Sequence, residues 1–139
     1  MNSSKDMSII IFSFTAAGTE LNRRLCEKLK QNFHIERESN ACIGYAPEKY
    51  AGEGILPLPA DKAALIGSGW GKSAYVFIGA AGIAVRYIAP WVKDKYTDSP
   101  VLVIDEKGKY VIPLLSGHVG GAAALADEVA DMIGAVSVH

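Results

Sequence analysis

Hydrophobic residues fall into two kinds of pattern along this chain. Short stretches that are apolar almost throughout are typical of strands buried on both faces of a sheet. These stretches cover residues 7–14, 74–79 and 100–105. After the first of them, Leu21, Leu25 and Leu29 recur at helical spacing, and charged side chains occupy positions between them. The pattern predicts three core strands and an amphipathic helix after the first strand.

The remaining segments carry weaker signals. A charged turn with a glycine at residues 105–109 predicts a hairpin, so residues 110–115 should return antiparallel to the strand at 100–105. Residues 39–59 hold three glycines and three prolines and are expected to form a loop. Further helices are expected at 60–66, 80–92 and 119–133, and a short strand at 33–37.

Alternation of strand and helix signals is typical of an α/β protein. Because the strands are apolar throughout, we expect a three-layer α/β sandwich with a mostly parallel sheet, Rossmann-like or flavodoxin-like, and an antiparallel edge hairpin. Residues 1–6 are polar and are expected to be a flexible tail, whereas residues 7–139 are expected to form one α/β domain.

Composition narrows the range of partners. Lys and Arg total 14 and Asp and Glu total 15, a net charge of −1 that argues against nucleic acid as a partner. No uncharged run reaches the roughly 20 residues that a membrane span needs, and residues 1–6 lack the features of a secretory signal. Cys26 and Cys42 have no CxxC spacing, so we expect free thiols, without assigned chemistry, in a soluble cytoplasmic protein without a membrane partner.

Three glycine-rich corners join a predicted strand to a predicted helix: TAAG at 15–18, GAAG at 79–82 and SGHVGG at 116–121. If each strand leads directly into its helix, the corners lie at the carboxyl ends of their strands, where open α/β sheets bind ligands. Free N–H groups at a helix start favour an anion. The candidate substrate-binding residues at these corners are Gly18, Gly82, Ser116, Gly117, Gly120 and Gly121.

His118 has two interpretations. Beside oxyanion donors, an imidazole with an ordinary pKa of about 6.5 can act as a general base or acid; as a structural residue it would cap the helix. No metal site is expected, because His118 lacks further ligands at metal-binding spacing. Arg86 is either a salt-bridge partner or a fork for a carboxylate. Asp98 either belongs to a solvated helix end or faces the cleft that the glycine-rich corners would line.

Nucleotide binding finds little support in the glycine motifs. The stretch GSGWGKS at 67–73 is not a phosphate-binding loop, because Ile66 replaces the first glycine and a strand follows the stretch instead of preceding it. The corner at Gly117 has neither GxGxxG spacing nor an acidic residue at the expected distance. Nucleotide binding at Gly117 remains a third interpretation.

Several motifs in the second half of the chain occur in order: AAGIAVR at 80–86, APWVKDKYTD at 89–98 and VIDEKGKYVIPLLSGHVGG at 103–121, followed by an alanine-rich helix. Together they resemble the N-terminal domain of the CbiG family, the cobalt-precorrin-5A hydrolases of anaerobic cobalamin (vitamin B12) biosynthesis. The first strand and TAAG at 15–18 also fit the start of that domain.

The resemblance implies an enzyme that adds water to the δ-lactone of cobalt-precorrin-5A and releases acetaldehyde, leaving cobalt-precorrin-5B. The cobalt belongs to the substrate, so no cofactor is implied. Our hypothesis is that His118 is the base and that nearby backbone N–H groups and Arg86 receive the oxyanion or substrate carboxylates. The alternative is a noncatalytic corrinoid-binding or scaffold module.

The resemblance also bears on partners. The family continues into a C-terminal domain, which is absent from residues 1–139, so this missing domain is an expected partner and activity of the chain alone stays open. Apolar edge strands make a homo-oligomer a further expectation.

Overall fold

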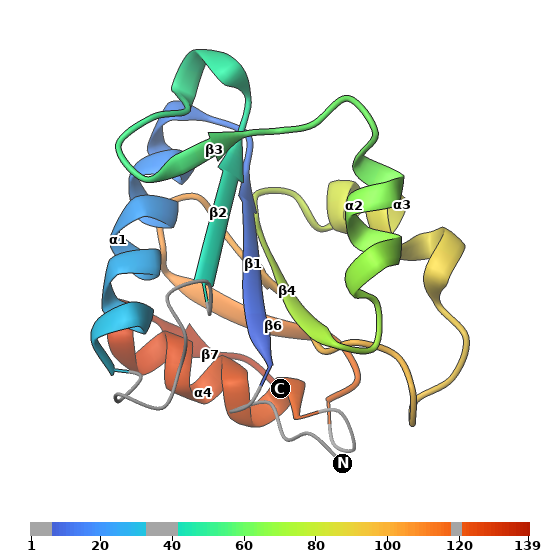
Figure 1. Cartoon of the computed structure of the whole chain (residues 1–139). Coiled ribbons are helices and arrows are strands. Elements are labelled where there is room, and N and C mark those ends of the chain that lie inside the picture. The colour runs from blue at the N-terminus through green and yellow to red at the C-terminus, as the bar shows by residue number, and fades with distance from the viewer. Residues whose placement is uncertain (1–6, 33–41, 118–120) are drawn as a thin grey trace.

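A computed structural model of the chain describes residues 7–32, 42–117 and 121–139. In these ranges a seven-stranded sheet forms the middle layer, with the strand order β3-β2-β1-β4-β5-β6-β7 (Figure 1). The strands are β1 (Ser8–Ser13), β2 (Cys42–Ala46), β3 (Ile55–Pro57), β4 (Ser73–Ile78), β5 (Val101–Ile104), β6 (Tyr110–Leu115) and β7 (Val136–Ser137). The helices are α1 (Ala16–Asn32), α2 (Lys62–Gly69), α3 (Ala81–Ile88) and α4 (Ala122–Ile133), with short 3-10 turns η2 (Glu48–Tyr50) and η3 (Ala89–Trp91).

The sheet is parallel except where β6 runs antiparallel to β5. This confirms the predicted α/β class, the mostly parallel sheet and the antiparallel hairpin. The hairpin is not at the edge, however, because β7 pairs with the outer side of β6, with Tyr110 opposite Val136. Strand β2 follows β1 on one side, whereas β4 lies on its other side, so the strand order reverses between β1 and β4.

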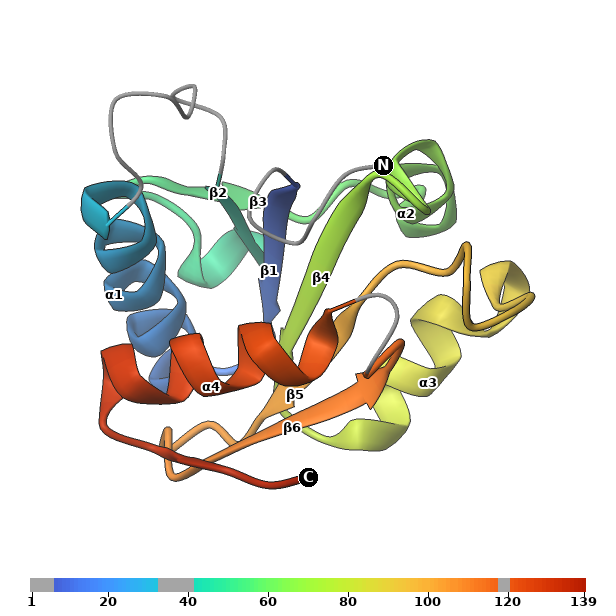
Figure 2. The same ribbon diagram turned by 90° about the horizontal axis from the view of Figure 1, so that it is seen from below.

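Helices α1 and α4 cover one face of the sheet, and α2 and α3 cover the other (Figures 1 and 2). Strand β1 is buried on both sides for this reason: Ile9 and Ile11 pack under α1, whereas Ile10 and Phe12 pack under α2 and α3. Phe12 also stacks on Phe77 of β4, with ring centroids 5.0 Å apart. The continuous apolar run in the sequence is explained by this double burial.

Strands β2 and β3 lie in the segment 39–59 that was predicted to be a loop. That prediction was wrong because β2 buries small residues, Cys42, Gly44 and Ala46, which give no strand-like apolar run. The strand predicted at 33–37 lies outside the described residues. Helix α2 occupies Lys62–Gly69 and so includes the start of the GSGWGKS stretch.

Two further helices differ from their predicted bounds. Helix α3 ends at Ile88, where η3 with Pro90 takes over, because proline cannot continue the hydrogen-bond ladder. Helix α4 begins at Ala122, after Gly121 in the left-handed conformation with φ 87°. Within the described ranges, none of the helices combines the length and the apolar character that crossing a membrane requires.

Candidate functional site

The carboxyl ends of β1 and β4 meet at the point where the strand order reverses. Ser13 and Ile78 are register partners there, and the chain continues from them into α1 on one face and α3 on the other. Thr15 caps α1, since the N–H of Gly18 donates to Thr15 Oγ1 over 3.0 Å. This switch point is the usual ligand edge of an open α/β sheet.

The two glycines predicted to bind substrate at this edge differ in their surroundings. Gly18 is buried, and a Cβ there would lie 3.0 Å from Thr15 Oγ1 and 3.4 Å from Ile78 Cγ2. Gly18 therefore allows α1 to pack closely on the strand ends and is not open to a ligand. A Cβ at Gly82, by contrast, would meet nothing within 4 Å, and the residue is exposed. Gly82 is the open corner of the switch point.

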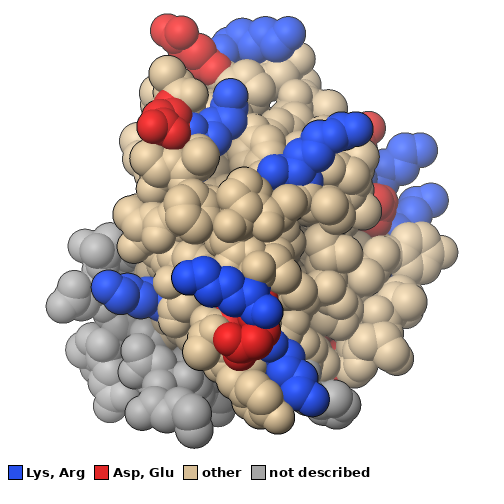
Figure 3. Space-filling model, turned by 90° about the vertical axis from the view of Figure 1, so that its right-hand side faces the viewer, with Lys and Arg blue, Asp and Glu red and all other residues tan. Residues whose placement is uncertain are grey.

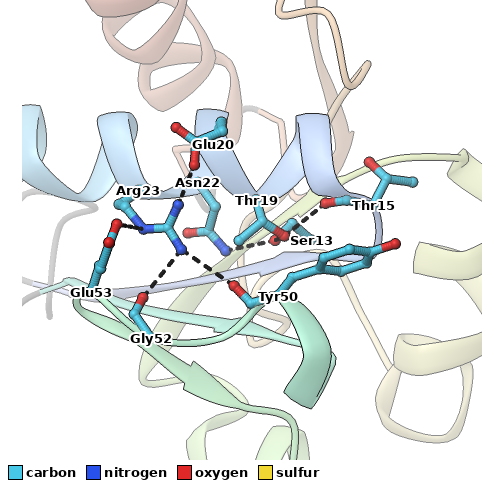
Figure 4. Close-up of polar contacts among 9 residues, drawn as sticks. All are labelled: Ser13, Thr15, Thr19, Glu20, Asn22, Arg23, Tyr50, Gly52 and Glu53. Atoms are coloured by element: carbon cyan, nitrogen blue, oxygen red, sulfur yellow. Dashed lines mark hydrogen bonds and ion pairs between the residues drawn. The ribbon is translucent and has the colours of Figure 1, made fainter.

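A buried polar network below this edge was not predicted from the sequence (Figure 4). Asn22, which is fully buried, donates through Nδ2 to Ser13 Oγ over 3.0 Å and to the carbonyl oxygen of Tyr45 over 3.2 Å. The hydroxyls of Ser13 and Thr19 are 2.9 Å apart, and Thr19 donates to the carbonyl oxygen of Thr15 over 2.7 Å. The network ties α1 to β1 and β2. Its sequence signal was a pair of polar residues on the apolar face of a helix.

Arg23 fixes the turn that follows β2. Its guanidinium pairs with Glu20 and donates to the carbonyl oxygens of Tyr50 and Gly52 over 3.2 and 3.1 Å (Figure 4). Glu53 lies 3.8 Å from its Nε. This arginine next to the switch point is already engaged in holding the fold.

The third glycine-rich corner lies at the opposite edge of the sheet. Because β6 is antiparallel, its last residue Leu115 pairs with Val101, the first residue of β5. Ser116 and Gly117 therefore lie where the parallel strands begin. Strand β4 has six residues, which separates the two edges by roughly 20 Å. The expectation that all three glycine-rich corners lie at one ligand-binding edge of the sheet was wrong, because Ser116 and Gly117 lie at the edge opposite to Gly18 and Gly82.

The edge at which the parallel strands begin is called the amino edge. The structure does bring together Asp98, Ser116, Gly117 and Gly121 there. The hydroxyl of Ser116 donates to the carbonyl oxygen of Asp98 over 3.0 Å. Asp98 is 5% exposed, and its carboxylate accepts from Trp70 Nε1 over 3.1 Å and from the N–H of Lys93 over 3.0 Å. Asp98 is thus neither part of a solvated helix end nor a free carboxylate in an open cleft.

The start of α4 has fewer free donors than predicted. The N–H groups of Ala122 and Ala123 donate to the carbonyl oxygens of Ser116 and Gly117, each over 3.0 Å. Ser116 takes a positive φ of 59° to make this turn. Backbone donors for an oxyanion at this junction must therefore come from other N–H groups than these two. His118 and Gly120, which were predicted as base and binding residue, lie outside the described residues, so both stay predictions.

Arg86 lies in the last turn of α3 and is exposed. Among the residues that the structure describes, no acidic side chain forms an ion pair with it. Figure 3 shows the α2 and α3 side of the molecule, where uncharged residues cover most of the surface and several basic side chains lie next to acidic ones. Within residues 7–32, 42–117 and 121–139, His, Cys, Asp and Glu side chains form no group of three that could hold a metal ion.

The strand order, the switch between β1 and β4 and the helices on both faces define an open, doubly wound α/β domain. A family model described as cobalamin synthesis G N-terminal matches residues 65–139, which is more than half of the chain. The chain belongs to this family. The matched segment contains α3, the β5–β6 hairpin and the junction at Ser116.

Individual proteins agree with the family assignment. A cobalt-precorrin-5A hydrolase of Salmonella typhimurium is 42% identical over 136 residues, which are 97% of this chain and 36% of that protein. A cobalt-precorrin-5A hydrolase of Priestia megaterium is 56% identical over 55 residues, 40% of this chain and 15% of that protein. A crystal structure of a cobalamin biosynthesis protein G homologue from Sulfolobus solfataricus has a TM-score of 0.71 and 28% identity over 97% of this chain and 38% of its own. The chain thus spans little more than a third of the length of the Salmonella and Sulfolobus proteins, although each match covers 97% of this chain.

Proposed function

We propose that this chain acts in cobalamin biosynthesis as part of a cobalt-precorrin-5A hydrolase. In the proposed reaction, water opens the δ-lactone of cobalt-precorrin-5A, acetaldehyde leaves, and cobalt-precorrin-5B remains. The observation that carries the proposal is the 42% identity to a cobalt-precorrin-5A hydrolase over 97% of this chain. Identity at this level along almost the whole chain supports a shared role better than the α/β fold, which hosts many functions.

The proposed reaction centre is the amino-edge junction between β6 and α4. Opening a lactone needs a base for the attacking water and donors for the oxyanion that forms. We propose His118 as the base and the backbone around Gly117, Gly120 and Gly121 as the donors. Asp98 and Ser116 support this junction, since Ser116 bonds to the backbone of Asp98 and the Asp98 carboxylate holds Trp70.

The remaining length of the relatives is the proposed partner. This chain covers 36% of the Salmonella protein and 38% of the Sulfolobus structure, and both matches leave most of the longer protein outside the match. A domain from that remaining length would supply the second wall of the cleft, because ligand sites often lie between domains. Gly82 and Arg86 are exposed on this chain, and they are the proposed positions where this chain binds carboxylates of the macrocycle.

The test measures acetaldehyde release and the visible spectrum after mixing cobalt-precorrin-5A with wild-type protein and with two variants. His118→Ala removes the proposed base and should lower acetaldehyde release by about 100-fold or more while spectral binding persists. Gly82→Leu places a large side chain in the open corner of the switch point, where an added Cβ would meet nothing within 4 Å. Thermal unfolding of both variants controls for folding.

The outcomes separate the alternatives. Unchanged turnover of His118→Ala would remove this residue from the mechanism, and loss of turnover in Gly82→Leu alone would move the reaction to the switch point. A spectral change without acetaldehyde in the wild type would show that residues 1–139 only bind the corrinoid. Adding the part of the Salmonella protein that lies outside the match would then test whether turnover needs a second domain.

A further inference from the structure

The two cysteines of the chain lie side by side in the core. Cys26 of α1 and Cys42 of β2 have their Sγ atoms 3.3 Å apart. Cys26 is 5% exposed and Cys42 is 1% exposed. The sequence contains two cysteines in total, so a disulfide within one chain joins this pair and no other. The proposed hydrolase reaction uses neither thiol.

The two thiols are chemically unequal. The Cys42 thiol donates to Cys26 Sγ, and the Cys26 thiol in turn faces Asn22 Oδ1 at 3.5 Å. The hydrogen bond from Cys42, assisted by the positive charge of Lys30, lowers the pKa of Cys26 although burial opposes this. The same hydrogen bond, together with burial, raises the pKa of Cys42. Cys26 is therefore the thiol that ionises first and reacts first.

Tight packing restricts what can react with the pair. A Cβ added at the neighbouring Gly44 would lie 2.5 Å from Asn22 Oδ1 and 3.1 Å from Cys26 Sγ. A position without room for one methyl group has no room for a glutathione or another large adduct on sulfur. A small oxidant and a small product are the chemistry that this site admits.

We propose that Cys26 and Cys42 form an oxidative modification site, at which hydrogen peroxide converts the two thiols into a disulfide that links α1 to β2. The Cys26 thiolate attacks a peroxide oxygen, which gives a sulfenic acid and one water after protonation. Cys42 then attacks the Cys26 sulfur and displaces a second water. Two thiols and one peroxide thus yield one disulfide and two waters. The sulfurs need to approach by about 1.2 Å from their present separation to reach bonding distance.

The experiment treats the native wild-type chain with hydrogen peroxide, removes the oxidant, alkylates free thiols under denaturing conditions and measures the intact mass. The expected result is a monomer that has lost about 2 Da and takes up no alkyl group. Dithiothreitol should restore both alkylatable thiols. Two thiols that still alkylate fully after native oxidation, or disulfide-linked dimers as the main product, would overturn the proposal.

Matched serine variants test the inequality of the thiols. In Cys42→Ser, the sulfenic acid on Cys26 has no second thiol to resolve it, so it should persist and be trapped by a dimedone-type reagent that is added under denaturing conditions after the oxidant is removed. In Cys26→Ser, Cys42 should stay reduced under the same treatment. Equal trapping in both variants would contradict the assigned order of reaction, and the wild-type mass measurement decides the proposal even if a serine variant fails to fold.

Discussion

Replacing Gly44 by alanine adds one methyl group at a crowded point between β2 and α1. The new Cβ would lie 2.5 Å from Asn22 Oδ1, 2.6 Å from Ile55 Cδ1 and 3.1 Å from Cys26 Sγ. The end of the Ile55 side chain can move away by rotation. Asn22 cannot, because its Nδ2 donates to Ile11, Ser13 and Tyr45, and moving the side chain weakens these buried bonds.

The expected loss of stability combines two effects. Overpacking a close-packed core costs about 1–3 kcal/mol, and each weakened hydrogen bond about 0.5–1.5 kcal/mol. We expect Gly44→Ala to lower the free energy of unfolding by about 2–4 kcal/mol, which moves the urea midpoint down by about 1–2 M for a domain of this size. Circular dichroism and tryptophan fluorescence across a urea series measure this midpoint.

Gly82→Ala is the matched control for Gly44→Ala. It adds the same methyl group within α3, where the new Cβ would meet nothing within 4 Å beyond its chain neighbours and the backbone of its own helix. Because alanine restricts the unfolded chain more than glycine does, this variant should gain about 0.4–1 kcal/mol. Equal stability of Gly44→Ala and wild type would refute the close packing of β2 against α1, whereas a loss of stability in both variants would refute the distinction between the two sites.

Three further predictions follow from buried or hydrogen-bonded polar groups. Burial raises the pKa of Tyr75 to about 12, so the folded state keeps the phenol proton, whereas the unfolded chain loses it near pH 10. The free energy of unfolding should therefore fall between about pH 10 and 12. Urea midpoints measured along that pH range should fall less in Tyr75→Phe than in the wild type. Asp98→Ala leaves the Trp70 indole N–H without its acceptor and should cost about 1–3 kcal/mol, measured by urea unfolding. The hydrogen bond with His139 lowers the pKa of Asp127. The lowered pKa stabilises the folded state at pH values above the ordinary carboxyl pKa, and this contribution is lost as the pH falls through the lowered pKa. His139→Ala should raise the pKa of Asp127 toward its ordinary value, as an NMR titration will show.

The parts of the fold that follow from local pattern were predictable from the sequence. Strands β1, β4 and β5 bury both faces, so nearly every residue is apolar and the strands stand out. Strand β2 could not be found in this way, because its inward positions hold Cys42, Gly44 and Ala46, whose small size is set by the approach of α1. That approach is a tertiary contact, and no local pattern carries it.

The candidate site was harder to predict because it depends on strand direction. All three corners have the local form of a strand, glycines and a helix, and this form alone does not say at which edge a corner lies. The predicted hairpin already implied the answer, since an antiparallel return of β6 brings Gly117 back to the edge where β5 starts. The buried network of Asn22, Ser13 and Thr19 was beyond reach for a related reason: its polar residues are visible in the sequence, but their partners come from three separate elements.

The separation of the edges also limits how a hydrolase could use this domain. At the amino edge, Asp98 and the N–H groups of Ala122 and Ala123 already have partners within the fold, so a substrate there depends on groups other than these. At the switch point, Gly82 is open but lies roughly 20 Å from the amino edge. This distance is too long for a single group of the substrate to bind at Gly82 and react at the amino edge. A lower kcat in His118→Ala with a higher KM in Gly82→Leu would therefore assign the reaction to the amino edge and carboxylate binding to the switch point. A lower kcat in Gly82→Leu with a higher KM in His118→Ala would instead place water attack at the switch point and carboxylate binding at the amino edge.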